Sequence, residues 1–151
     1  MKVFVKYPTK DEEKTIMRRM AKTEFVADVK PVFTLEDIAS IRRQIDAVQV
    51  SGKLEDYIID IVMATREPEQ YGLERLAEYI EYGASPRASL ALNLGSKAYA
   101  FLAGRNYVLP EDVKAIAPDV LNHRIILSYE AESEEITSMA CIQQILKTLN
   151  V

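Results

Sequence analysis

The chain has 151 residues, of which 48% are hydrophobic and 28% charged, enough for one domain with an apolar core. Its 19 basic and 23 acidic residues give a net charge of −4, which argues against a broad nucleic-acid-binding surface. One cysteine excludes an internal disulfide framework, no apolar run is long enough to span a membrane, and no signal-peptide pattern opens the chain. The composition therefore predicts a soluble cytoplasmic domain.

The first two predicted elements are a strand and a helix. The period-two alternation of residues 2–7 predicts a half-buried strand, which Pro8 ends. Thr9, with Glu12 three residues later, has the capping-box pattern that begins a helix. Such a strand needs a sheet, so either it pairs with residues 124–129 or its sheet lies in a part of the protein that is not present here.

Two further amphipathic helices follow. Thr34 begins the first, and Ser51-Gly52 separates it from the second, which ends near Pro68. Residues 67–84 are interrupted by glycine and proline and predict a short helix only.

A long alanine-rich helix is predicted from Ser85, an N-cap residue, and Pro86, a proline at the first helical position. We expect its core face to consist of Ala91, Leu94, Ala98, Phe101 and Leu102, and its alanines to allow close approach of neighbouring helices. Gly104 ends it.

The last part of the chain predicts two helices and a strand. One helix begins at Pro110, a short strand covers residues 125–129, and Ser133 caps the final helix. The whole pattern predicts a mainly α fold of about six helices with one or two short strands.

Motifs of common catalytic centres are absent from the sequence, including the phosphate loop, the dinucleotide turn and zinc-ligand pairs. His123 is the single histidine and has no nucleophile motif, so a structural role at a helix end is favoured. Cys141 lies between apolar residues, which favours a buried thiol over a reactive one. The acidic trio 11–13 complements the dipole at a helix start, and no metal site is predicted.

Arg87 is the informative residue, because it lies at the second position of the helix that Ser85 and Pro86 begin. A cation there opposes the helix dipole, whereas the free N–H groups of the first turn attract anions. A bound phosphate would resolve this conflict through the forked guanidinium donors. From spacing alone, a solvated arginine or a pair with a nearby carboxylate stays open as an alternative.

Two sequence strings carry a family resemblance. GASPRA at residues 83–88 and GRNYVLPEDV at residues 104–113, followed by residues 123–125, resemble the C-terminal part of the MoxR-type AAA+ ATPases. Residues 2–9 resemble that family's passage from ATPase core to lid, so the resemblance covers essentially the whole chain. Leu109 departs from the pattern, because a hydroxyl or acidic cap is more usual there.

The resemblance implies a nucleotide-binding role. In such proteins the nucleotide lies between an α/β core and a helical lid, and an arginine that opens a lid helix, called sensor 2, contacts the terminal phosphates. Arg87 matches that arginine, with Ser85 and Pro86 beside it, and Tyr7 and Pro8 match the core–lid junction near the base. The implied ligand is ATP with Mg²⁺ in the full-length protein, and none is expected on the isolated chain.

The resemblance also implies a domain division, with residues 1–7 as the end of the core and residues 8–151 as the lid. The phosphate loop and catalytic acids of the family belong to a core upstream of Met1, so we expect a fragment that does not hydrolyse ATP alone, whereas its parent does. Relatives form rings, commonly hexamers, and act as chaperone-like remodellers. The expected partners are the core, neighbouring subunits and a client complex, without nucleic acid or a membrane span.

Two other functions remain open from the sequence. An independent helical interaction module without a nucleotide role would gain support if residues 2–6 paired within the domain and buried Val3 and Val5. A winged-helix-like nucleic-acid binder is suggested by a helix followed by the strand at residues 124–129, although the acidic balance counts against it.

Overall fold

The computed structural model describes residues 1–23 and 29–150 and shows a mainly α fold. Over these residues it contains eight α-helices, one 3₁₀ turn and one two-stranded sheet, so the predicted class is confirmed. In chain order the elements are α1 (Lys10–Met20), α2 (Leu35–Asp46), α3 (Gly52–Met63), η1 (Pro68–Tyr71), α4 (Glu74–Tyr79), β1 (Ile80–Tyr82), α5 (Pro86–Leu102), α6 (Pro110–Leu121), β2 (Ile126–Leu127), α7 (Tyr129–Ser133) and α8 (Ser138–Thr148).

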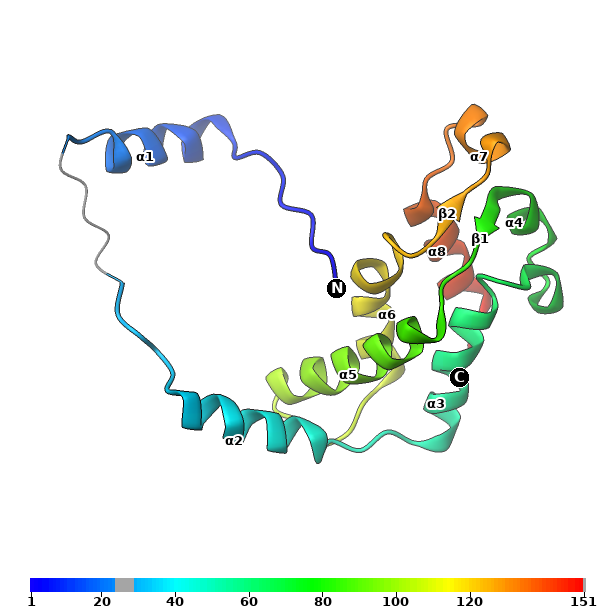
Figure 1. The fold of residues 1–151 in the computed structure, drawn as a ribbon, viewed down its shortest axis with the longest axis horizontal. Coiled ribbons are helices and arrows are strands. Elements are labelled where there is room, and N and C mark those ends of the chain that lie inside the picture. Colours follow the sequence, from blue (N-terminus) through cyan, green and yellow to red (C-terminus); the bar gives the residue numbers. More distant parts are fainter. Residues whose placement is uncertain (24–28, 151) are drawn as a thin grey trace.

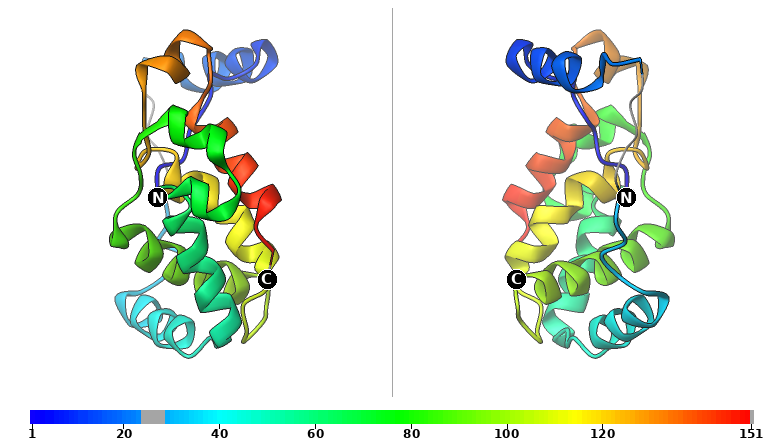
Figure 2. Two further views of the ribbon diagram at one scale, coloured as in Figure 1. Left: turned by 90° about the vertical axis from the view of Figure 1, so that its right-hand side faces the viewer. Right: turned by 90° about the vertical axis from the view of Figure 1, so that its left-hand side faces the viewer.

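The core lies between α3, α5, α6 and α8, with α5 packed against both α3 and α6 (Figure 1). Helices α2 and α7 lie towards opposite ends of this body (Figure 2). Close packing of α5 on α6 depends on small residues, because a Cβ added at Gly95 would lie 2.6 Å from the Cδ1 of Ile116. The close approach predicted from the alanine-rich sequence of α5 is therefore present.

The predicted core face of α5 is partly wrong. Leu94 and Leu102 are 56% and 83% exposed, whereas the buried positions of the helix have mostly small side chains: Ala88, Leu92, Ser96 and Ala100. Ala91 and Phe101, which were also predicted on this face, are partly buried and pack against the core. Tight helix packing instead places the small side chains inward, because larger ones would hold the neighbouring helices apart.

Residues 1–9 form no strand, which corrects the first predicted element. The predicted pairing with residues 124–129 is also wrong, because β2 pairs antiparallel with β1, where Ile80 lies opposite Leu127. Val5 is 92% exposed, and the Lys2 N–H donates to the Asp119 carbonyl of α6 at 2.8 Å. The interaction-module hypothesis therefore gains no support from this segment.

Helices α1 and α2 begin after Thr9 and Thr34, as predicted, and both have a capping box. Glu12 accepts from the backbone N–H of Thr9 at 2.7 Å, and Asp37 accepts from that of Thr34 at 2.8 Å. Neither helix contains a buried residue, and α1 stands apart from the body (Figure 1).

The C-terminal elements differ from the prediction. Ser133 is the last residue of the short helix α7, and the final helix begins five residues later, with the Thr137 hydroxyl accepting from the Ala140 N–H. Between them Glu135 adopts a positive φ of 57°, a conformation that ends a helix. Ser133 and Thr137 carry the same capping chemistry, so the sequence pattern alone did not separate them. No helix in the described ranges has the length and apolar character to cross a bilayer.

Candidate functional site

The turn before α5 is held by two consecutive residues, Thr65 and Arg66, in the turn that follows α3. The Thr65 hydroxyl accepts from the Ala84 N–H at 2.9 Å and donates to the Val62 carbonyl at 2.6 Å. The Nε of Arg66 donates to the Ala84 carbonyl at 2.6 Å. Both polar backbone groups of Ala84 are therefore satisfied from the turn after α3, and both Thr65 and Ala84 are fully buried.

Gly83 allows this turn to approach α3 closely. A Cβ at this position would lie 2.2 Å from the carbonyl oxygen of Thr65 and 2.8 Å from the Cγ of Arg66. Because one of these atoms belongs to the backbone, no side-chain adjustment would make room for it. The glycine of the GASPRA string is therefore required by backbone packing.

The remaining residues of the string form the start of α5. Ser85 is the N-cap residue and Pro86 the first helical residue, as predicted, but the Ser85 side chain makes no capping hydrogen bond. Ala88 is fully buried against the core, which fixes the rotation of the helix. This rotation leaves Arg87, between Pro86 and Ala88, on the exposed side.

Arg87 makes no ion pair or side-chain hydrogen bond within residues 1–23 and 29–150. The first turn of α5 also contains no acidic residue to balance the helix dipole. The carboxylate pair that the sequence left open is therefore not formed in the described part of the chain. An exposed guanidinium beside an uncapped helix start suits an anion such as a phosphate.

The second string, at residues 104–113, is a structural element. Gly104 follows the end of α5 with a φ of 74°, and Arg105 then forms a forked ion pair with Asp112, at 2.6 Å and 2.8 Å. The Asp112 carboxylate also accepts from the Leu109 N–H at 2.8 Å, so it caps α6 where the residue-109 side chain has no capping group. The departure at Leu109 thus leaves the helix start capped.

This loop is also tied to the segment between α2 and α3. The Gln49 N–H donates to the Asn106 carbonyl at 2.9 Å, and the Val108 N–H donates to the Gln49 carbonyl at 3.0 Å. The Arg105–Asp112 pair therefore holds a loop to which the segment between α2 and α3 is bonded.

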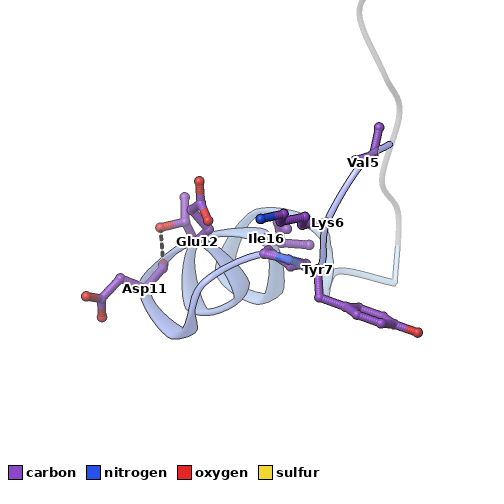
Figure 3. A pocket seen from close by; sticks show the side chains of 8 residues that line it. Val5, Lys6, Tyr7, Asp11, Glu12 and Ile16 are labelled. Atoms are coloured by element: carbon purple, nitrogen blue, oxygen red, sulfur yellow. Dashed lines mark hydrogen bonds between the residues drawn. The ribbon is translucent and has the colours of Figure 1, made fainter. Parts of the chain in front are cut away.

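The resemblance placed Tyr7 and Pro8 near a nucleotide base, but the segment that leads into α1 stands apart from the start of α5 (Figure 1). They line a pocket with Val5, Asp11 and Ile16 that is built entirely from residues 5–16 (Figure 3). Tyr7 is 99% exposed, and Figure 3 shows its ring pointing away from α1. Ser85, Pro86 and Arg87 therefore lie together at the start of α5, whereas Tyr7 and Pro8 belong to a separate segment.

The surroundings of His123 and Cys141 favour structural roles. Desolvation and the positive charges of Arg124 and Lys2 lower the pKa of His123, which favours a neutral imidazole at pH 7. Burial raises the pKa of the Cys141 thiol, in keeping with a small core residue. Over the described ranges, no cluster of three or more His, Cys, Asp or Glu side chains is arranged to hold a metal ion.

Sequence reasoning missed Thr65 and Arg66. Their contacts reach a turn 18 to 19 residues further along the chain, and no local pattern reports such a contact. The one available signal was Gly83, because a glycine two residues before an N-cap position indicates either a special φ or a close backbone approach.

Comparisons with known proteins agree with this arrangement. The AAA lid domain family matches residues 73–145. "Chaperone MoxR1" of Mycobacterium tuberculosis is 36% identical over 148 residues, which cover 98% of this chain and 39% of that protein. "Protein MoxR" of Paracoccus denitrificans is 40% identical over 90 residues, covering 56% of this chain and 26% of that protein.

A crystal structure of a proposed ATPase from Cytophaga hutchinsonii has 48% sequence identity and a TM-score of 0.92, and it covers 99% of this chain and 46% of that one. A helical bundle that matches the AAA lid domain and is similar over nearly its whole length to an ATPase structure defines the lid of an AAA+ protein. The chain belongs to the MoxR family of AAA+ ATPases and corresponds to the C-terminal lid of that family. It spans less than half the length of these relatives.

Proposed function

We propose that this chain is the nucleotide-sensing lid of an ATP-driven remodelling protein, and that Arg87 is its sensor 2 residue. The observation that carries the proposal is an exposed guanidinium, without an ion-pair partner in the described residues, beside a helix start whose N-cap side chain is not engaged. The terminal phosphates of ATP would bind the guanidinium and the backbone N–H of Arg87, since Pro86 has no N–H and the Ala88 N–H donates to the Ser85 carbonyl.

The residues present fit such a ligand. Arg87 would bind phosphate oxygens through two parallel N–H groups, and the Ser85 hydroxyl, which makes no capping bond, is available to donate beside it. Mg²⁺-bound ATP supplies the phosphoryl group that is transferred to water. Arg87 would stabilise the negative charge on the phosphates and tie the position of α5 to the nucleotide state.

The wider role follows from the same proposal. Residues 1–7 would form the end of an ATPase core, and residues 8–151 the lid. The protein would form a ring in the cytoplasm, most commonly a hexamer. Movement of the lid would be transmitted to the neighbouring subunits of that ring. The name of the mycobacterial relative supports a chaperone-like activity on a client complex.

Hydrogen exchange of the intact ATPase tests the phosphate contact. With a non-hydrolysable ATP analogue bound, the amides of the first turn of α5 are expected to exchange more slowly than with ADP, because the terminal phosphate orders them. Helix α8 belongs to the same lid and serves as the internal control, with equal exchange in both states. Equal exchange at residues 87–90 in both states would contradict the contact.

A further inference from the structure

We infer that Thr65 and Arg66 are positioning residues for Arg87, and that they aim the start of α5 at the nucleotide. We call this pair the Thr65–Arg66 clamp. The inference rests on the proposed sensor 2 role of Arg87. It adds two residues that support this role from the turn after α3. Neither residue is proposed to touch the nucleotide.

The clamp holds both backbone polar groups of a single residue, Ala84. Ala84 lies two residues before the first helical residue, and its N–H and carbonyl bond to Thr65 and Arg66 at 2.9 Å and 2.6 Å. Two bonds at opposite ends of one residue fix both its position and its orientation. A single bond would leave the turn free to pivot.

The start of α5 receives no capping hydrogen bond from the side chain of its N-cap residue, Ser85. The caps of α1, α2, α3, α7 and α8 each accept a hydrogen bond from the first turn, whereas Ser85 does not. The direction in which α5 begins is therefore held by the turn before it. That turn is fixed by the clamp and by the close contact of Gly83 with the Thr65 backbone.

The Thr65 hydroxyl is fully engaged within the fold, both as a donor and as an acceptor. It is fully buried, and it both accepts from Ala84 and donates to Val62. Replacing it with the isosteric valine would leave the buried Ala84 N–H without its partner. The turn would then shift to recover that bond, and displacements of about 1 Å at a reacting centre lower rates by as much as 10²-fold.

Steady-state ATP hydrolysis by the intact ATPase tests the clamp through a double-mutant cycle. Thr65→Val and Arg66→Ala are each expected to lower kcat for ATP about tenfold, with a smaller change in KM. Thr65→Ser keeps the hydroxyl and is expected to restore at least half of the wild-type kcat. Thr65→Val combined with Arg87→Ala is expected to be no slower than Arg87→Ala alone, because a positioning residue acts through the residue that it positions.

Two controls distinguish a loss of positioning from a general loss of stability, and failure of the clamp from failure of the proposed function. Ser96→Ala removes another buried hydroxyl from α5, one that bonds to Leu92, and should leave kcat unchanged. Arg66 is exposed, so Arg66→Ala provides a folded variant if Thr65→Val does not fold. Normal kcat in the clamp variants, or additive losses in the double mutant, would overturn the clamp and leave sensor 2 intact. Normal kcat in Arg87→Ala would overturn the proposed function itself.

Discussion

Replacing Arg87 with alanine in the intact ATPase is expected to lower kcat for ATP about 100-fold. The guanidinium is exposed beside an uncapped helix start, so its loss removes charge-assisted donors from the phosphates while the fold is retained. Removing one preorganised donor from a developing oxyanion costs about 10²–10³ in rate in well-studied enzymes. The measurement is steady-state phosphate release at saturating ATP, with the helical content of the variant checked by circular dichroism.

Two further variants make this result specific. Arg87→Lys keeps the charge but loses the fork, so we expect activity between those of the wild type and the alanine variant. Arg42→Ala removes an exposed arginine from α2 and should leave turnover unchanged. A wild-type rate in Arg87→Ala, or an equal loss in Arg42→Ala, would contradict the sensor 2 role.

The start of α5 shows what could be predicted of the candidate site. Serine and proline in sequence determine where the helix begins, and this local chemistry placed Arg87 at its second position correctly. The Thr65–Arg66 clamp was not predictable, because it joins two loops through contacts with buried backbone groups. The reason for Gly83 became clear only with the carbonyl of Thr65 beside it.

For the fold as well, elements with strong local patterns were predictable and contacts between distant segments were not. Helices with capping boxes, such as those after Thr9 and Thr34, were predicted from local patterns and begin where expected. The pairing of β1 with β2 was not predicted, because strands of three and two residues carry almost no periodic signal. The core face of α5 was misread for a related reason, since the size of buried residues depends on how closely the neighbouring helices approach.

Replacing Asp112 with asparagine is expected to lower the free energy of unfolding of the chain by about 3 kcal/mol at neutral pH, the scale for breaking a buried ion pair. The carboxylate is 2% exposed, accepts two hydrogen bonds from Arg105, and caps α6 through Leu109. An amide retains the shape of the side chain but not its charge. Urea titrations followed by circular dichroism provide the measurement, and Asp11→Asn, in an exposed pair at 3.6 Å, is the matched control without a measurable change.

The pH dependence of this difference separates an effect of charge from one of packing. Although desolvation by burial acts to raise the pKa of Asp112, the hydrogen bonds and charge of Arg105 and the Leu109 N–H outweigh it, so the pKa in the folded state lies below its usual value. The stabilisation is therefore complete above the unfolded-state pKa of about 3.9 and is lost as the pH falls through the lowered folded-state pKa. Wild-type stability should consequently fall more steeply than that of Asp112→Asn below about pH 4, and the gap between them should narrow. A gap that stays constant from pH 7 to pH 3 would mean that the pair contributes through shape rather than charge.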